Sequence, residues 1–272
     1  GRLPRLGIAL IGAITLVLRS YAQTSPQAFE AATIKHSNPN KPQAATIRSS
    51  QGRFEANSTT LKELIAIAYD LNFDISQQIS GGPGWVNSDK FDVVARADEA
   101  ALARLRTIPA EQQGEQRRIM IEELLSDRFG LRIHREPKEL TVYTLSIANK
   151  GPRLKPGQLQ ANLPANVPQT RINVMGPGFL EGHNAYVWQL AKTLSVQPEV
   201  AGRTVVDKTA LTDKYDFTLK WMPESPVDRQ STQVDLPSLF TALQDQLGLR
   251  LTSAKATVEV VIIDSAKPPS EN

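Results

Sequence analysis

The most distinctive short string in the chain is Gly81-Gly82-Pro83-Gly84-Trp85. A glycine-rich loop can hold a phosphate group on its backbone N–H groups, but neither a GK[ST] string nor a helix start follows it, as a P-loop requires. The string therefore predicts a tight turn with Trp85 packed behind it. Because an aromatic ring beside glycines also suits the wall of a ligand groove, Gly82, Gly84 and Trp85 are the candidate ligand-contact residues.

The chain has three histidines, His36, His134 and His183, and none lies in an H-x-x-x-H, H-E-x-x-H or H-x-H pattern. Spacing alone leaves open a zinc site or a Ser-His-Asp triad, since such partners meet only in the fold. Strand alternation places His134 on a solvated face beside Arg132, and His183 precedes a predicted helix, where it suits a turn or capping role. No G-x-S-x-G or S-x-x-K string indicates a serine enzyme. We therefore predict no catalytic residue, no metal ligand and no cofactor.

Two acidic strings are alike, Asp89-Lys-Phe-Asp92 and Asp213-Lys-Tyr-Asp216. Paired carboxylates can serve acid/base chemistry or bind calcium, but calcium loops need a denser series of oxygen ligands. An Asp-Lys-aromatic-Asp string that enters a strand is more simply a turn with local ion pairing.

Charge and cysteine content exclude several classes of protein. The 272 residues hold 31 Lys and Arg against 28 Asp and Glu, with a formal charge of +3. Residues 1–22 contain three arginines and no acid, which leaves 28 basic and 28 acidic residues in the rest. A neutral chain without aromatic residues interleaved among basic ones argues against a nucleic-acid partner. With no Cys, the chain has no disulfides, thiolate zinc sites or Cys nucleophile.

The first 22 residues read as a secretory signal peptide. Arg2 and Arg5 precede a 13-residue apolar run, Leu6–Leu18, and small residues at Ser20 and Ala22 suit cleavage after Ala22. The run is shorter than the roughly 20 residues of a membrane span. We expect an extracytoplasmic protein, periplasmic or secreted, that meets the membrane only through the leader if the leader is not cleaved.

The chain contains internal similarity, which predicts a tandem duplication. Three strings recur in the same order: GRFEANSTTLKELIAIAY (52–69) as GFLEGHNAYVWQLAKTLS (178–195), DKFD (89–92) as DKYD (213–216), and DRFGLRI (127–133) as DQLGLRL (245–251).

Each copy contains two predicted helices. Thr60 and Glu63 form a capping box for the first helix of the first copy. Buried stripes at helical spacing are Leu61, Leu64, Ile65 and Ala68 in one copy, and Val187, Leu190, Ala191 and Leu194 in the other. The second helices run from Pro109 or Ala110 to Gly130, burying Met120, Ile121, Leu124 and Leu125, and from about Asp235 to Gly248, burying Leu239, Phe240, Leu243 and Leu247.

Strands complete each unit. We expect strands at Phe91–Ala95 and Tyr215–Leu219, and a closing hairpin in each copy: Leu131–His134 with Leu140–Ile147, and Leu249–Leu251 with Val258–Ile263. An extra strand, Phe29–Lys35, precedes the first copy.

The predicted fold class is α+β, with two tandem related units that each carry two helices on a mainly antiparallel sheet. The predicted organisation is a signal peptide (1–22), a first unit with the extra strand (23–150), a Pro/Gly-rich linker (151–169), a second unit (170–267) and a flexible tail (268–272).

Several strings together resemble a known family: FEAATIK (29–35), ISGGPGW (79–85), DKFD (89–92), LLSDRF (124–129), HRE (134–136) and VVDKTALTDKYDF (205–217). The chain resembles the soil-associated secreted proteins of unknown function that are greatly expanded in acidobacteria, over about residues 28–272. The resemblance implies a secreted or periplasmic bacterial protein with no established activity. Some relatives carry a similar module after a membrane metallopeptidase of the antibiotic-sensor type, which hints at sensing, but this chain has neither H-E-x-x-H nor a multispan region.

The sequence favours a non-enzymatic, sensor-like module that binds an unknown ligand or envelope protein, at the seam between its copies or at the Gly81–Trp85 loop. The alternatives are an interaction domain for a membrane partner and an envelope hydrolase.

Overall fold

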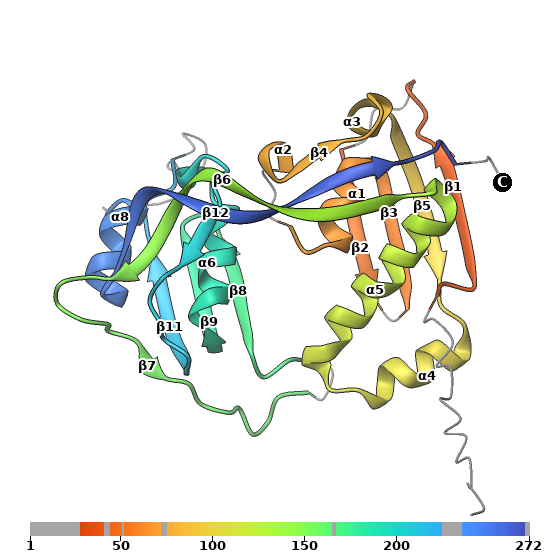
Figure 1. The fold of residues 1–272 in the computed structure, drawn as a ribbon. Helices are drawn as coiled ribbons and strands as arrows, with labels where there is room; N and C mark the ends of the chain where they lie inside the picture. Colours follow the sequence, from red (N-terminus) through yellow and green to blue (C-terminus); the bar gives the residue numbers. More distant parts are fainter. Residues whose placement is uncertain are drawn as a thin grey trace, which may run out of the picture.

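The computed structural model describes residues 28–40, 44–50, 52–71, 75–164, 167–224 and 236–269. It is an α+β structure with two lobes, joined by a long two-stranded ribbon that crosses from one lobe to the other (Figure 1). The predicted fold class is confirmed at this level. Residues 1–22, the predicted signal peptide, lie outside the described residues, as do residues 270–272 of the predicted tail. No helix in the described ranges combines the length and the hydropathy that a membrane crossing requires.

The first lobe is built on a four-stranded antiparallel sheet in the order β1-β5-β3-β2. Its strands are β1 (Ala31–His36), β2 (Thr46–Ser50), β3 (Arg53–Thr60) and β5 (Lys90–Arg96). Its helices are α1 (Leu61–Ala68), α2 (Ile75–Gln78), α3 (Trp85–Ser88), α4 (Glu99–Thr107) and α5 (Ala110–Phe129). The core lies between this sheet, α1 and the last turns of α5.

The second lobe has the same kind of sheet, in the order β7-β11-β9-β8. Its strands are β7 (Lys155–Pro156), β8 (Arg171–Gly176), β9 (Phe179–Tyr186) and β11 (Lys214–Lys220). Its helices are α6 (Val187–Ser195), a 3-10 turn (Pro198–Val200), α8 (Leu239–Ala242) and a π-helical turn (Leu243–Leu247). Trp221 is its largest fully buried side chain.

The helix signals read from the sequence have the expected structural roles. Glu63 N–H donates to Thr60 Oγ1 at 3.3 Å and Thr60 N–H donates to Glu63 Oε2 at 2.7 Å, which is the predicted capping box. Gly130 and Gly248 end their helices in the left-handed region, with φ of 55° and 65°. The expected buried stripes are buried, except that Phe240 is only partly so.

The predicted closing hairpins are wrong. Each pair of short strands is one continuous strand, β6 (Arg132–Ile147) or β12 (Leu249–Ser265), and the two strands pair antiparallel with each other along their whole length. Leu145 of β6 packs in the core of the second lobe, whereas Val261 and Ile263 of β12 pack in the core of the first. Each lobe therefore takes a strand from the other half of the chain, and the boundary at residue 150 does not separate the lobes.

Two short strands extend the ribbon into a four-stranded sheet of order β10-β6-β12-β4. The strand β4 (Ile79–Gly81) runs parallel to β12, and β10 (Val205–Asp207) runs parallel to β6. The residues just before them meet, since Gln78 Nε2 donates to Thr204 Oγ1 at 2.6 Å. This bond links the two lobes beside the ribbon, as does an ion pair between Asp70 and Lys192.

The same β-bulge occurs in both lobes. In the first, Ser58 has a φ of 53° and its N–H donates to Asp92 Oδ1 at 2.9 Å. In the second, Asn184 has a φ of 45° and its N–H donates to Asp216 Oδ1 at 2.7 Å. The second aspartate of each repeated string thus accepts a hydrogen bond from the strained residue of the neighbouring strand, which offsets part of the cost of the left-handed conformation.

The Pro/Gly-rich segment 151–169 contributes to the second lobe. Its Lys155 and Pro156 form β7, which pairs with β11 as β1 pairs with β5 in the first lobe. The strand predicted as an extra element before the first copy therefore has a short counterpart beside β11.

The strand exchange predicts that a residue near the C-terminus stabilises the first lobe. Ile263→Ala should lower the free energy of unfolding by about 2–5 kcal/mol, because it removes buried methyl groups from that core. Amide hydrogen exchange followed by mass spectrometry should become faster in β5 and α1. The half-buried neighbour Ile262 provides the matched control, Ile262→Ala. The predicted hairpin would place Ile263 in the second lobe. Faster hydrogen exchange confined to that lobe would therefore contradict the observed pairing of β6 with β12.

Candidate functional site

The glycines of the predicted ligand loop lie against the ribbon. Gly81 and Gly82 have φ values of 80° and 73°, and a Cβ on Gly81 would lie 2.7 Å from the carbonyl oxygen of Ile263. Glycine is required there because β4 turns sharply while its backbone touches β12. Gly84 has open space where its Cβ would be.

Trp85 lies behind that loop and is partly buried. It begins the four-residue helix α3, so a short helix does start there, contrary to the expectation from the sequence. Its ring stacks on Phe129 with centroids 6.4 Å apart and meets the edge of Phe91 at 6.2 Å. The tight turn with a packed tryptophan is therefore present. Contact of Gly82, Gly84 and Trp85 with a ligand stays a prediction.

The histidines do not gather in one place. The His36 ring lies 4.8 Å from the ring of Phe91, and His134, exposed on the ribbon as predicted, lies 2.7 Å from Asp264 Oδ1 through Nδ1. His183 does not cap a helix; it lies in β9 beside the bulge. Within the described residues, no three His, Asp or Glu side chains are arranged to hold a metal ion.

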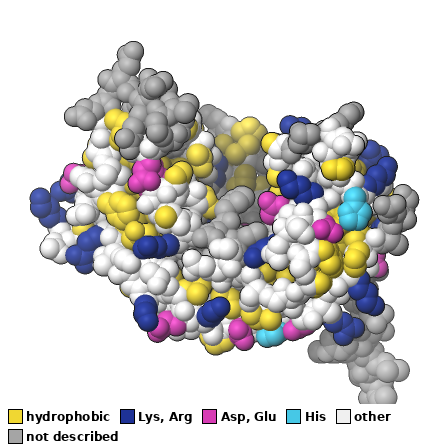
Figure 2. Space-filling view, turned by 90° about the horizontal axis from the view of Figure 1, so that it is seen from above, with side chains coloured by type: hydrophobic (Ala, Val, Ile, Leu, Met, Phe, Trp, Pro, Cys, Tyr) yellow, Lys and Arg dark blue, Asp and Glu magenta, His cyan; other side chains and the backbone are white. Residues whose placement is uncertain are grey.

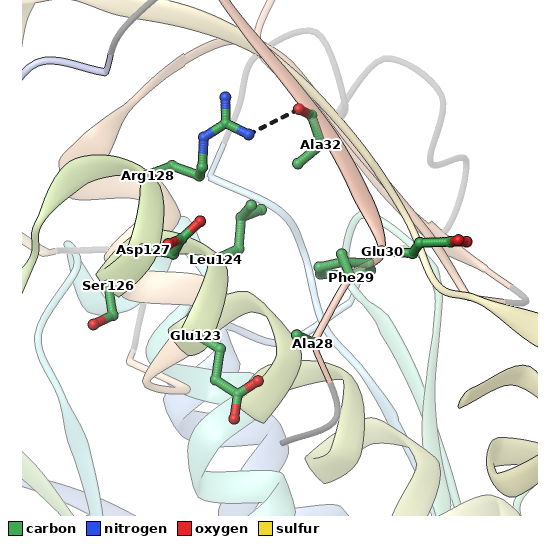
Figure 3. A pocket seen from close by; sticks show the side chains of 9 residues that line it. All are labelled: Ala28, Phe29, Glu30, Ala32, Glu123, Leu124, Ser126, Asp127 and Arg128. Carbon is green, nitrogen blue, oxygen red and sulfur yellow. Dashed lines mark hydrogen bonds between the residues drawn. The ribbon is translucent and has the colours of Figure 1, made fainter. Parts of the chain in front are cut away.

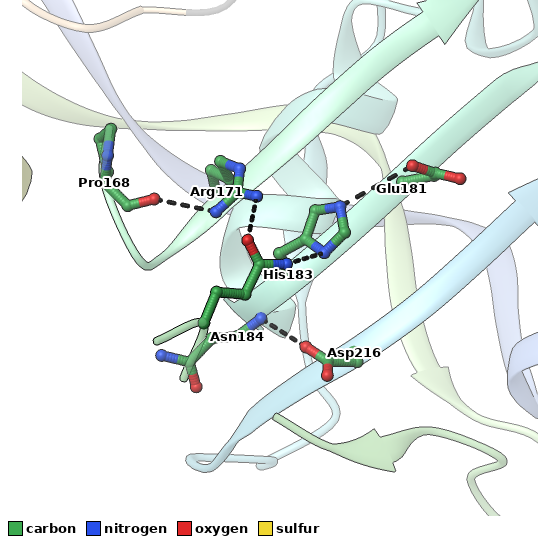
Figure 4. A network of polar contacts seen from close by, with 7 residues as sticks. Pro168, Arg171, Glu181, His183, Asn184 and Asp216 are labelled. Atoms are coloured by element: carbon green, nitrogen blue, oxygen red, sulfur yellow. Dashed lines mark hydrogen bonds and ion pairs between the residues drawn. The ribbon is translucent and has the colours of Figure 1, made fainter. Parts of the chain in front are cut away.

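His183 belongs to a polar network on the second lobe (Figure 4). Its Nδ1 lies 3.3 Å from Gln160 Nε2, and its Nε2 lies 3.7 Å from Glu181 Oε2. Arg171 holds Gln160 in turn, since its guanidinium donates to Gln160 Oε1 at 2.8 Å and to the Pro168 carbonyl at 3.1 Å. The imidazole therefore has a hydrogen-bond partner at Nδ1 and a carboxylate near Nε2.

The strand geometry of β9 places the side chains of Glu181 and His183 on one face of the second lobe's sheet. Glu181 and His183 are two residues apart on β9, so both point to the same face of the sheet. Between them, Gly182 leaves room for the ring of Phe217, which a Cβ at that position would overlap. The bulge at Asn184 then brings Asp216 beside this row.

These residues border an open groove of about 580 Å³. The charged and polar side chains that line it are Arg153, Lys155, Gln158, Glu181, His183, Asp216, Thr218 and Gln246. Gln246 closes one end, because its side-chain amide bonds both the N–H and the C=O of Lys220 on the free edge of β11. Arg153 is held in place by a 2.7 Å bond to the carbonyl of Asp245. A groove with both signs of charge suits a small polar ligand.

A second cavity, of about 500 Å³, lies in the first lobe between β1 and the end of α5 (Figure 3). Arg128 crosses it to donate to the carbonyl of Ala32 at 3.0 Å. Glu123 lines the cavity, and its Oε2 is buried with no hydrogen-bond partner among the described residues. Burial raises the pKa of Glu123, because the charged form loses water.

Sequence reasoning missed the groove because part of it comes from the segment interpreted as a linker. Lys155 and Gln158 line the groove, and that segment has no periodic pattern to mark them. Sequence reasoning also did not identify Trp188, which is 53% exposed on α6, as a candidate contact residue. A signal for it exists, since a tryptophan that falls outside the apolar stripe of an amphipathic helix must face solvent or a partner.

A family model described as "Protein of unknown function (DUF3738)" matches residues 62–266. The chain belongs to this family. The match includes the second lobe and the ribbon, but in the first lobe it begins within α1 and leaves out β1, β2 and β3. Both β6 and β12 lie inside the matched region. No curated protein and no solved structure matched the chain.

The partly buried carboxyl of Glu123, whose Oε2 has no partner within the described ranges, predicts a pH dependence of stability. Its pKa in the folded state is raised, so its contribution to stability is present at low pH and is lost as the pH rises through that pKa. Glu123→Gln should therefore be more stable than the parent at pH 7, and its unfolding free energy should fall less between about pH 4 and 7. Urea denaturation across that range measures both, with the exposed Glu139→Gln as control. Equal pH dependence in the parent and Glu123→Gln would contradict the assignment.

Proposed function

We propose that this protein is a non-enzymatic, sensor-like binding module of the bacterial cell envelope that takes a small polar ligand in the groove of its second lobe. The observation that supports the proposal best is the groove itself, with a histidine that lies between Gln160 and Glu181 and with both signs of charge around it. Membership in a family of unknown function is compatible with this role and does not decide it.

We also propose that the chain arose by tandem duplication. Gln78 and Thr204 are 126 residues apart, as are Ser58 and Asn184, and both pairs occupy equivalent places in the two lobes. Glu139 pairs with Thr257 in the ribbon, and these residues are 118 apart, like the repeated strings at 127 and 245. The bulge and its aspartate also recur. These observations support one ancestral unit whose two copies exchanged their last strands.

The proposed location rests on the sequence alone. Residues 1–22 carry the features of a signal peptide, so we propose an extracytoplasmic protein of the soil-associated acidobacterial type. Fractionation of expressing cells, followed by N-terminal sequencing that finds Gln23 first, would support cleavage.

The proposed partners are a ligand or another envelope protein, with no nucleic acid. Basic and acidic side chains are interspersed over the face seen in Figure 2, with hydrophobic groups between them. On this face, such mixing argues against a nucleic-acid partner, because nucleic-acid binding needs a continuous basic surface.

Two other functions stay open as alternatives. An interaction domain for a membrane partner would use the same envelope location. An envelope hydrolase has one specific observation in its favour, since His183 lies beside Glu181 and the pair borders a groove.

The groove predicts a histidine-dependent affinity. A panel of amino acids, dipeptides, saccharides and nucleotides, screened by thermal shift, should yield a stabilising ligand. His183→Ala should weaken its binding about tenfold or more, since one hydrogen bond to a charged or polar ligand group is lost. His134→Ala is the matched control, because that histidine also pairs with a carboxylate but lies exposed on the ribbon. Equal affinity in both variants would exclude the groove.

The glycine loop is tested separately. Gly84→Gln should leave the free energy of unfolding nearly unchanged, because no atom lies within 4 Å of its Cβ position. If the loop contacts the ligand, the added side chain should reduce affinity in calorimetric titration. Unchanged affinity would remove Gly82, Gly84 and Trp85 from the site.

A further inference from the structure

An exposed aromatic pair lies next to the groove. Trp188 is the second residue of α6 and is 53% exposed, whereas Val187, Leu190 and Leu194 of the same helix are buried. Its ring stacks with that of Tyr186, at a centroid distance of 6.1 Å and an interplanar angle of 20°. The two rings are nearly parallel and form a stepped aromatic surface.

This pair continues the row of polar groups in the groove. Tyr186 is the cross-strand partner of Lys214, and the Lys214 ammonium lies 5.1 Å from the centre of the Tyr186 ring. Asp216, which lines the groove, is two residues further along β11, a distance of roughly 7 Å at the usual strand rise. The aromatic surface and the groove are therefore adjacent parts of one face.

We propose that this face binds a saccharide chain, with one sugar ring stacked on Trp188 and Tyr186 and the next held in the groove by Asp216, Glu181 and His183. The inference rests on the proposed function of the groove and names its ligand class.

The chemistry of the face matches that of a sugar. A pyranose ring presents a face of C–H groups, which packs on the negative face of an aromatic ring. Around its rim it presents hydroxyls that each donate and accept hydrogen bonds. Carboxylates accept from them, while the imidazole and the Lys214 ammonium can donate to them. A charged groove beside an exposed tryptophan supplies both kinds of contact.

A protein partner is less well matched to this surface. A tryptophan that anchors a protein interface usually lies in a desolvated patch depleted of charged residues. One turn after Trp188 on α6 lies Lys192, which is paired with Asp70, and the Lys214 ammonium lies over the ring of its stacked neighbour Tyr186. The polar surroundings favour the saccharide.

The test uses the full chain and two soluble probes, the hexasaccharides of N-acetylglucosamine and of glucose. At least one should bind and should change the tryptophan fluorescence, because Trp188 is exposed, whereas Trp221 is buried and Trp85 is partly buried. Trp188→Ala should lower the affinity at least tenfold, and Trp188→Phe, which keeps an aromatic face, should retain most of it. Leu159→Ala, at a residue that is 75% exposed, controls for loss of apolar surface. Circular dichroism confirms that each variant folds.

Three results would overturn the inference. The first is that neither hexasaccharide binds at millimolar concentration. The second is that Trp188→Ala binds with the same affinity as the parent. The third is that Trp188→Phe loses as much affinity as Trp188→Ala. If neither saccharide binds but another ligand does so in a manner that His183→Ala abolishes, the saccharide inference fails while the binding function stands. If a hexasaccharide binds with full sensitivity to Trp188 and none to His183, the inference fails for the groove.

Discussion

The antiparallel pairing of β6 with β12 is the interaction on which the two-lobed structure depends. These strands bond to each other along their length, and each ends in the core of the lobe formed mainly by the other half of the chain. Neither core is complete without the distant strand, because Leu145 fills one and Ile263 the other. The ribbon therefore fixes the lobes relative to each other, and the Gln78–Thr204 bond and the Asp70–Lys192 ion pair add to that constraint.

Both lobes are built on a four-stranded antiparallel sheet, but the edge strand beside β11 is much shorter than the one beside β5. This difference leaves room for the groove. In the first lobe, β1 pairs along β5 from Ala31 to His36. In the second, β7 pairs only with Tyr215 and Asp216, so the edge of β11 beyond them borders open space that Gln246 closes at Lys220. The bulge recurs, but the residue before it is Asn57 in the first lobe and His183 in the second. A shared backbone arrangement thus carries a distinct set of polar side chains where the covering strand is short.

The sequence predicted local features well. The capping box at Thr60, the helix end at Gly130 and the buried stripe of α6 follow from interactions within one or two turns, and the structure has them. The strands β5 and β11 were predicted within one residue at each end. The groove was not predicted, because its residues come from β7, β9, β11 and the π-helical turn, which only the fold brings together. The predicted turn or capping role of His183 was wrong, because the sequence around it does not distinguish a turn from a bulge within a strand.

What the sequence determined by itself was the principal helices, the strands β5 and β11 and the positions that are buried, since these depend on propensity, capping and periodicity. The tertiary structure decided which strands pair. A strand shows the same alternating pattern whether its partner is four residues away or more than a hundred, so the segment Arg132–Ile147 reads equally as two strands of a hairpin or as one. The choice between them belongs to the two cores, each of which is filled only when the strand runs on into the other lobe.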